Sequence, residues 1–301
     1  MLEQRAFEPE FLSKLDGLLL GVRRARTVRA GRRTLGRVQG GGIEPENFRE
    51  YTAGDDLRYL DWNAFARLDD LTIRTFRADR QVEATVLVDA SASMGVPARD
   101  DKLGLALLLG LGLAYVAMSE NDPVRVVAIR GDRGGPRLIA SRFYRRHESY
   151  YELRPLVATL KAGGDTRLAA AVTELLGERR PPGIVIVISD FLVNASDYEA
   201  ALTQLVAARH EVKVVHVMGE TEMAGAYPPG PYRLRDAETG ETREVMLGPA
   251  AAQACHRRAT AHAERVGSFC ARHGLNHMQA FSAARVDETI VRDFPHLGAI
   301  V

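Results

Sequence analysis

The chain has 301 residues, of which 46% are hydrophobic, so it carries enough apolar material for one large domain or a domain with an appendage. Forty basic and 39 acidic residues give a formal net charge of +1, which excludes a global field that would attract nucleic acid or an anionic membrane. The two cysteines, Cys255 and Cys270, fall in one helical stretch at a separation of about 22 Å, too far apart for a disulfide. Because the N-terminus also lacks a positively charged, apolar leader, we expect a cytoplasmic protein.

The first 80 residues show no alternation of strand and helix patterns, and we expect them to form an N-terminal appendage. Within them, Val22–Arg37 carries seven arginines and no acid. The run from Arg23 to Arg37 has the charge to bind phosphates or lipid head groups. A solvated basic face is the simpler interpretation, because no aromatic residues are interleaved for base stacking. We therefore expect no nucleic-acid partner.

From residue 81 to residue 301, β-branched runs alternate with helical stretches. This alternation predicts a mostly parallel, Rossmann-like sheet with helices on both faces. The predicted strands are Val82–Val88, Val124–Ile129, Ile184–Ile188, Val212–Val217 and His277–Phe281, with Arg137–Phe143 antiparallel to the second. The predicted helices are Lys102–Met118, Tyr150–Leu160, Leu168–Glu178, Tyr198–Ala208 and Ala250–Arg272. The pattern over Tyr232–Leu247 predicts an inserted hairpin.

The uncharged run Leu103–Met118 is apolar enough to suggest a membrane span. It is shorter than the about 20 residues that cross a bilayer. A helix buried between a sheet and another layer is also apolar on nearly every side. We expect a core helix and no transmembrane segment.

Oxygen-bearing side chains follow two of the predicted strands. Asp89, Ser91 and Ser93 come after the first strand, and Asp190 comes after Ile184–Ile188. A Gly-rich loop before a helix adds the hydroxyl of Thr166. The ligand crevice of an open α/β sheet lies beyond the carboxyl ends of its strands, so these five side chains can meet there.

The chemistry of this set points to a hard cation. Carboxylates and hydroxyls without His or Cys select Mg²⁺, Mn²⁺ or Ca²⁺ rather than zinc. Ser and Asp after a strand are alone more often helix caps, but their combination on the right elements favours a metal site. A second group, His256, His262, His273 and His277, lacks the spacing of paired histidine ligands.

Two motifs resemble known families. The pattern Asp89-x-Ser91-x-Ser93, followed by Thr166 and Asp190, resembles the metal-ion-dependent adhesion site of von Willebrand factor A domains. The string YTAGDDLRYLDWNAFAR at residues 51–67 resembles the signature of the bacterial family called domain of unknown function 58, and residues 234–241 match that family's hairpin. The resemblance implies a von Willebrand factor A-like fold and joint action with a MoxR-type AAA+ ATPase in protein remodelling or maturation.

The sequence departs from these patterns at three points. Asp165 stands before Thr166 where a small residue is expected, which leaves open whether its carboxylate joins the metal shell or faces solvent. Phe65 replaces a small polar residue. Many members of the family carry N-terminal membrane helices, and we expect none here.

The signature block around the only tryptophan has two interpretations. As a structural clamp, it would hold residues 1–80 against the main domain through burial of Trp62 and arginine–carboxylate pairs. As a recognition surface, it would bind a partner. The residues concerned are Asp55, Asp56, Arg58, Asp61, Trp62 and Arg67.

The function that these features favour is that of a non-enzymatic, metal-dependent adaptor. The cation would accept an Asp or Glu from the ATPase or from a client protein. No Gly-x-x-x-x-Gly-Lys-Ser/Thr motif is present for nucleotide. A metal-dependent hydrolase is the first alternative, although a Gly-x-Ser-x-Gly elbow is missing. A binder of nucleic acid or an anionic surface through Val22–Arg37 is the second.

Overall fold

The computed structural model describes residues 2–17, 45–52, 60–68, 71–76, 82–119, 121–132, 135–165, 167–225, 227–237 and 240–281. The chain divides into two compact units. Residues 1–23 and 82–301 form the larger unit, and residues 24–81 form the smaller one. The helical start of the chain therefore belongs with the main domain rather than with the rest of the expected appendage. That the smaller unit packs on the larger one stays a prediction.

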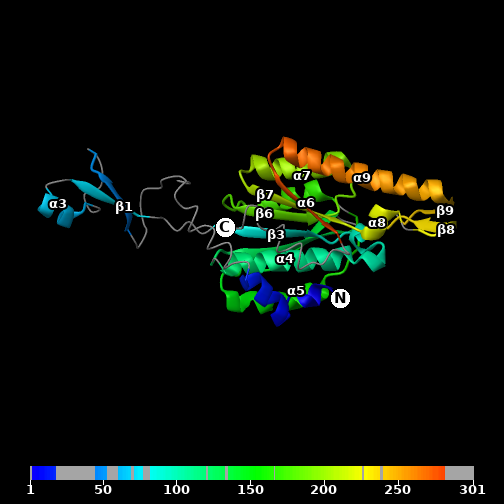
Figure 1. Cartoon of the computed structure of the whole chain (residues 1–301), viewed down its shortest axis with the longest axis horizontal. Helices are drawn as coiled ribbons and strands as arrows, with labels where there is room; N and C mark the ends of the chain where they lie inside the picture. Colours follow the sequence, from blue (N-terminus) through cyan, green and yellow to red (C-terminus); the bar gives the residue numbers. More distant parts are fainter. Residues whose placement is uncertain are drawn as a thin grey trace. The chain divides into compact units, whose positions relative to one another are not determined.

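A six-stranded sheet runs through the larger unit in the order β10-β7-β6-β3-β4-β5 (Figure 1). Five strands are parallel, and β5 pairs antiparallel with β4. This arrangement confirms the predicted fold class. The strands are β3 (Ala84–Asp89), β4 (Val124–Asp132), β5 (Gly135–Ala140), β6 (Ile184–Ser189), β7 (Glu211–Met218) and β10 (Asn276–Phe281).

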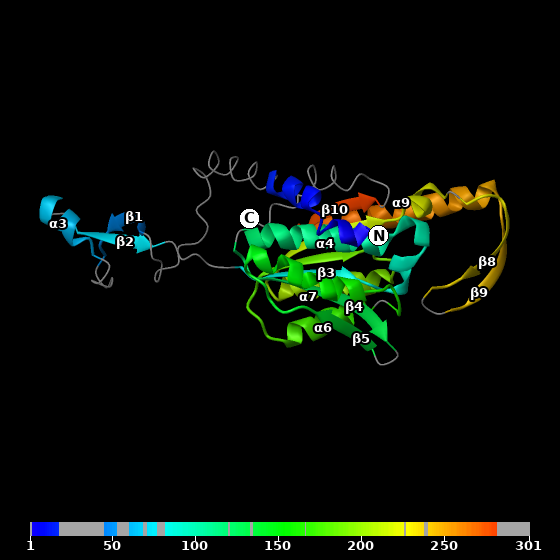
Figure 2. The same ribbon diagram turned by 90° about the horizontal axis from the view of Figure 1, so that it is seen from below.

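Helices cover both faces of the sheet, because its central strands are apolar on both sides (Figures 1 and 2). On one face lies α4 (Lys102–Ser119), which is itself covered by α1 (Leu2–Arg5), by helical residues 9–17, by η4 (His147–Leu153) and by α5 (Arg154–Thr159). On the other face lie α6 (Leu168–Gly177), α7 (Ala195–Ala207) and α9 (Pro249–Arg272). Each face thus has its own hydrophobic core.

The apolar helix α4 passes a length and composition test for a membrane span. In the structure, 89% of the apolar 18-residue stretch within Ala98–Ser119 is buried inside the protein. Tyr115, near its end, donates a hydrogen bond to Asp16 at 3.0 Å, and Tyr150 donates one to the backbone oxygen of Ala6 at 2.9 Å. The N-terminal helices are thereby fixed over α4, and the helix forms the centre of one core.

Two details differ from the prediction. The expected helix over Tyr150–Leu160 is wrong in its first half, which forms the 3-10 turns of η4 before α5 begins at Arg154. The cause is Pro155, which lacks a backbone N–H and fits only the first turn of an α-helix. The short helix α8 (Glu220–Ala224) was not predicted. After it, β8 (Gly230–Arg235) and β9 (Thr242–Leu247) form the expected hairpin.

The smaller unit contains an antiparallel pair of strands, β1 (Pro45–Glu50) and β2 (Thr72–Phe76), with α3 (Trp62–Leu68) between them in the chain. Asp61 is buried, and its carboxylate accepts the backbone N–H of Ala64 at 3.3 Å, which caps the first turn of α3. Trp62 is 60% exposed and contacts Phe65 edge to face.

The remaining members of the signature block are less fully described. Asp55, Asp56 and Arg58 lie outside the described residues, and for Arg67 only the backbone is described. The choice between a clamp and a partner-binding surface for this block stays a prediction.

Candidate metal centre

The carboxylate of Asp89 shapes the loop that carries two of the predicted ligands. Asp89 ends β3 and is 1% exposed. Its Oδ1 accepts the backbone N–H of Ser91 at 2.9 Å, and its Oδ2 accepts the hydroxyl of Ser189 at 2.6 Å. The first bond is the side-chain turn that Asp forms with the residue two positions on, and it bends the chain directly after the strand. Ser91 and Ser93 follow on this bend, with their hydroxyl oxygens 3.0 Å apart.

Asp190 comes to the same point from the neighbouring strand. Because β6 is parallel to β3, with Ile188 opposite Val88, the residues after both strands lie side by side. Asp190 is 2% exposed, and its Oδ1 accepts the hydroxyl of Ser93 at 3.3 Å and the backbone N–H of Leu192 at 3.1 Å. In the sheet, β4 and β5 lie on one side of β3, whereas β6, β7 and β10 lie on the other side. The order in which the chain adds strands therefore reverses between β3 and β6, and ligands bind at such a point in open α/β sheets.

The Gly-rich loop before α6 also reaches this edge of the sheet. The backbone N–H of Gly163 donates to the oxygen of Ala90 at 2.9 Å, and the N–H of Ala92 donates to the oxygen of Gly164 at 3.0 Å. These bonds join the loop to the chain on both sides of Ser91. Thr166 itself lies outside the described residues, so its part in the site stays a prediction.

The contacts of Asp165 that the structure describes lie within its own loop and against Gly131. Its Oδ2 accepts a hydrogen bond from Nε of Arg167 at 2.7 Å, and its backbone and side chain lie against Gly131. Its described contacts therefore stabilise the loop and do not include the other candidate ligands.

The oxygens that converge here fit a small divalent cation. Octahedral Mg²⁺ binds oxygen at about 2.0–2.1 Å, so neighbouring ligands at right angles lie about 3 Å apart. The separations from Ser91 Oγ to Ser93 Oγ and from Ser93 Oγ to Asp190 Oδ1 are 3.0 and 3.3 Å. Each oxygen of Asp89 accepts one of the hydrogen bonds described above and keeps a second lone pair for a cation. Among the described residues, no group of three or more His, Cys, Asp or Glu side chains could hold a metal, so the candidate site depends on hydroxyls beside two carboxylates.

Sequence reasoning missed the basic residue at this site. Lys102, the first residue of α4, is fully buried, and its Nζ lies 2.9 Å from Asp190 Oδ2 and 2.8 Å from Glu222 Oε1. Burial disfavours its charged form, but the two carboxylates outweigh this effect and raise the pKa of Lys102 above its usual value. One signal was available in the sequence, because Lys102 is the only charged residue of an 18-residue apolar helix.

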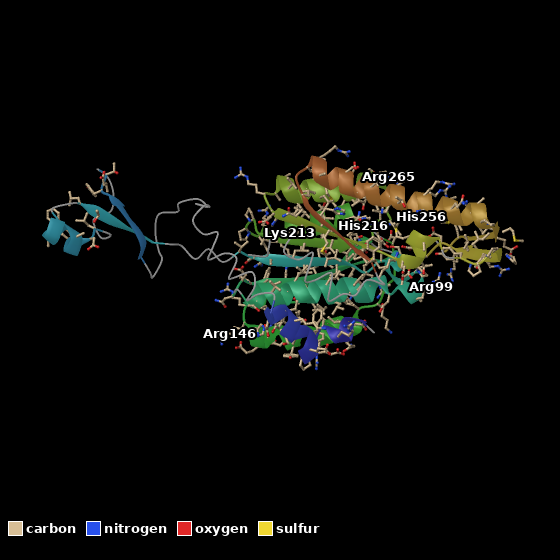
Figure 3. The ribbon with its side chains drawn as sticks, in the orientation of Figure 1. Arg99, Arg146, Lys213, His216, His256 and Arg265 are labelled. Atoms are coloured by element: carbon tan, nitrogen blue, oxygen red, sulfur yellow. The ribbon has the colours of Figure 1, made fainter. Side chains whose placement is uncertain are left out.

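Two histidines hold the backbone at Asp190. A ring nitrogen of His216 lies 3.1 Å from the backbone oxygen of Asp190, and one of His262 lies 3.0 Å from the same oxygen. His216 is in the interior, below α9 in Figure 3, and is fully buried. Burial, with the nearby His262 and His277, lowers the pKa of His216 to about 3, so it is neutral at physiological pH.

A mostly parallel sheet covered by helices on both faces is the fold class of von Willebrand factor A-like domains. The chain belongs to the family described as "Protein of unknown function DUF58", which it matches over residues 47–265. It is 31% identical over 263 residues to the uncharacterised proteins Rv1480 of Mycobacterium tuberculosis and Mb1516 of Mycobacterium bovis, in matches that cover 86% of this chain and 77% of each relative.

Solved structures give more distant similarities. BatB of Bacteroides thetaiotaomicron has 14% identity and a TM-score of 0.41, with 72% of this chain and 98% of BatB covered. The VWA domain of SpRpn10 has 11% identity and a TM-score of 0.41, with 73% and 99% covered. Manganese-loaded TRAP of Plasmodium vivax has 18% identity and a TM-score of 0.32, with 49% and 64% covered.

A first prediction concerns pH. Burial, followed by the charge of Asp190, raises the pKa of Asp89 to about 6 in the metal-free protein. Above that pH the carboxylate is ionised and free to bind a cation, and below it a proton competes for the same oxygens. Mn²⁺ affinity measured by calorimetry should therefore fall by about tenfold between pH 7 and pH 5. Equal affinity at pH 5 and pH 7, with the fold intact by circular dichroism, would contradict this.

A second prediction concerns the loop. Gly164 has φ +79°, and a Cβ there would lie 2.0 Å from the backbone oxygen of Gly131. Gly164→Ala should displace the loop and weaken Mn²⁺ binding at least tenfold, because the backbone conformation and the contact both exclude a side chain. Gly135→Ala is the matched control, since Gly135 also has a positive φ, +130°, but has no atom within 4 Å of the added Cβ. Equal Mn²⁺ affinity in the two variants would show that the loop plays no part in the site.

Proposed function

We propose that this DUF58 protein is a non-enzymatic adaptor that binds an acidic side chain of a partner protein through a divalent cation. Asp89, Ser91, Ser93 and Asp190 would hold the cation, with Thr166 as a fifth ligand. Mg²⁺ is the first choice, with Mn²⁺ or Ca²⁺ as substitutes, and the cation would supply positive charge for an incoming carboxylate. The observation that carries the proposal is the pair of oxygen separations, 3.0 and 3.3 Å, among Ser91, Ser93 and Asp190.

The charge of the site favours capture of a carboxylate. Two of the described ligands are neutral hydroxyls, and the ammonium group of Lys102 compensates part of the negative charge of Asp190. A cation in such a shell keeps part of its positive charge, so an incoming Asp or Glu gains more there than at a site saturated with protein carboxylates. Ser93 is only half-buried, so the site is open to solvent on its side.

The same contacts argue against a serine hydrolase. A nucleophilic serine needs a base within hydrogen-bonding distance. The hydroxyl of Ser91 lies against that of Ser93, and ring nitrogens of His216 and His262 face a backbone oxygen. Within the described part of the chain, therefore, no histidine is placed to activate Ser91. The basic run Val22–Arg37 of the nucleic-acid alternative lies outside the described residues.

The partner that we propose is a MoxR-type AAA+ ATPase, or a client protein on which it acts. The proposal rests on the DUF58 membership of the chain and on the lack of a P-loop motif in its own sequence. An adaptor of this kind would select the client while the ATPase supplies the energy. We place this action in the cytoplasm.

The test is capture of a purified MoxR-type ATPase from the same organism on immobilised protein. We expect capture with Mg²⁺, loss of capture with EDTA, and recovery when Mn²⁺ is added in excess. Asp89→Asn should weaken capture at least tenfold, because it removes the charge that holds the cation. Glu174→Ala removes a charge from an exposed position of α6 and is the control that should bind as the wild type does. Undiminished capture in EDTA would contradict a metal-dependent contact.

A further inference from the structure

Lys102 occupies a position that is costly for a lysine. It is the first residue of α4, where the positive end of the helix dipole opposes a cation. Its side chain has no exposed surface, and lysine is rarely buried to this degree unless it is paired. Neither helix formation nor core packing favours an ammonium group here. The two carboxylates that pair with Lys102 therefore account for its charge at this position.

Those partners connect the candidate metal centre to the helix beyond the next strand. Nζ of Lys102 lies 2.9 Å from Asp190 Oδ2, at the end of β6, and 2.8 Å from Glu222 Oε1, in α8. The loop before α4 makes a parallel connection, because the carboxylate of Asp100 accepts the hydroxyl of Thr221 at 2.7 Å. Thus α8 is joined to the start of α4 by a charged contact and by a hydrogen bond.

The contact with Lys102 gives the two oxygens of Asp190 different partners. Oδ1 faces the hydroxyl of Ser93, while Oδ2 is held by the ammonium group. A carboxylate with one oxygen already paired cannot turn both oxygens toward a cation without breaking that pair. The ammonium also supplies a positive charge that repels a second cation.

We propose that Lys102 is a positioning residue of the cation site, which keeps Asp190 Oδ2 away from the cation and limits cation affinity. The inference rests on the proposed function, since it assumes that Asp89, Ser91, Ser93 and Asp190 hold the cation. Glu222 acts in the opposite sense, because it shares the ammonium and so weakens the hold of Lys102 on Asp190. The cation affinity of the site consequently depends on Glu222 in α8, a helix that contributes none of the proposed ligands.

Opposite effects of two substitutions distinguish this role from a structural one. Lys102→Met keeps the length and apolar stem of the side chain but removes its charge, so both oxygens of Asp190 become available. We expect Mn²⁺ to bind at least tenfold more tightly to this variant than to the wild type. Glu222→Gln leaves the ammonium to Asp190 alone, so Mn²⁺ should bind at least threefold more weakly. A purely structural role would leave both affinities unchanged or reduce both.

The control is Arg99, an exposed cation three residues before Lys102, labelled in Figure 3. Arg99→Met removes the same charge from a solvent-screened position and should change Mn²⁺ affinity by less than twofold. Because Lys102→Met leaves the buried Asp190 and the half-buried Glu222 without their cation, it can fail to fold without metal. The double variant Lys102→Met, Glu222→Gln removes one charge of each sign and serves in its place, with tighter Mn²⁺ binding than the wild type expected.

In the experiment, the 301-residue chain is titrated with Mn²⁺ alone. Electron paramagnetic resonance measures the free ion at each step, and thermal melting confirms the fold. Tighter binding in Lys102→Met or in the double variant, with weaker binding in Glu222→Gln, supports the inference. Unchanged or weaker binding in the lysine variants, while Asp89→Asn abolishes binding, overturns the role of Lys102 and leaves the proposed function standing. Lack of saturable Mn²⁺ binding in every variant overturns both.

Discussion

The structure depends on the burial of two carboxylates side by side. Asp89 and Asp190 follow adjacent parallel strands, and they are 1% and 2% exposed. Two like charges that are removed from water on adjacent strands destabilise the fold unless other groups compensate them. Backbone N–H groups, the hydroxyls of Ser189 and Ser93 and the ammonium of Lys102 provide part of that compensation. A divalent cation would provide the remainder, and for this reason we propose a cation site at this point of the fold.

Compensation by Lys102 also connects the site to distant parts of the chain. The pairs Lys102–Asp190 and Lys102–Glu222 join residues 88 and 120 positions apart. They bring the ends of α4, β6 and α8 to one point. Since α8 leads into the β8–β9 hairpin and α9, the charge at the candidate site depends partly on the segment directly before this hairpin. The arrangement differs from a site whose ligands and counter-charges all belong to one loop.

Much of the larger unit could be predicted because its pattern is regular. The β-branched runs of β3, β4, β6 and β7 have no competing interpretation once helices are seen between them. Asp89, Ser91, Ser93 and Asp190 could be predicted as neighbours because the carboxyl ends of parallel strands meet at one edge. The expected helix over Tyr150–Leu160 failed in its first half because apolar spacing alone does not show where Pro155 allows an α-helix to begin.

Other features had no sequence signal of sufficient strength. Strands β1 and β2, PENFRE and TIRTF, carry charged and polar residues without a clear alternation, so no sheet was predicted in the first 80 residues. The five residues of α8 are too few to show a helical period. The sequence predicts Lys102 only as the start of an apolar helix, because a lysine is ordinarily solvated and its partners lie in segments that sequence alone does not bring together. The residue that balances the site thus emerges only from the fold.

The central claim is that the buried pair Asp89 and Asp190 belongs to a cation site. Its most direct test is anomalous diffraction from crystals of the protein grown with Mn²⁺. We expect one strong anomalous peak within about 2.2 Å of the hydroxyl oxygens of Ser91 and Ser93, with Nζ of Lys102 still bonded to Asp190 Oδ2. A peak elsewhere, or clear density for this loop without any peak in millimolar Mn²⁺, would contradict it.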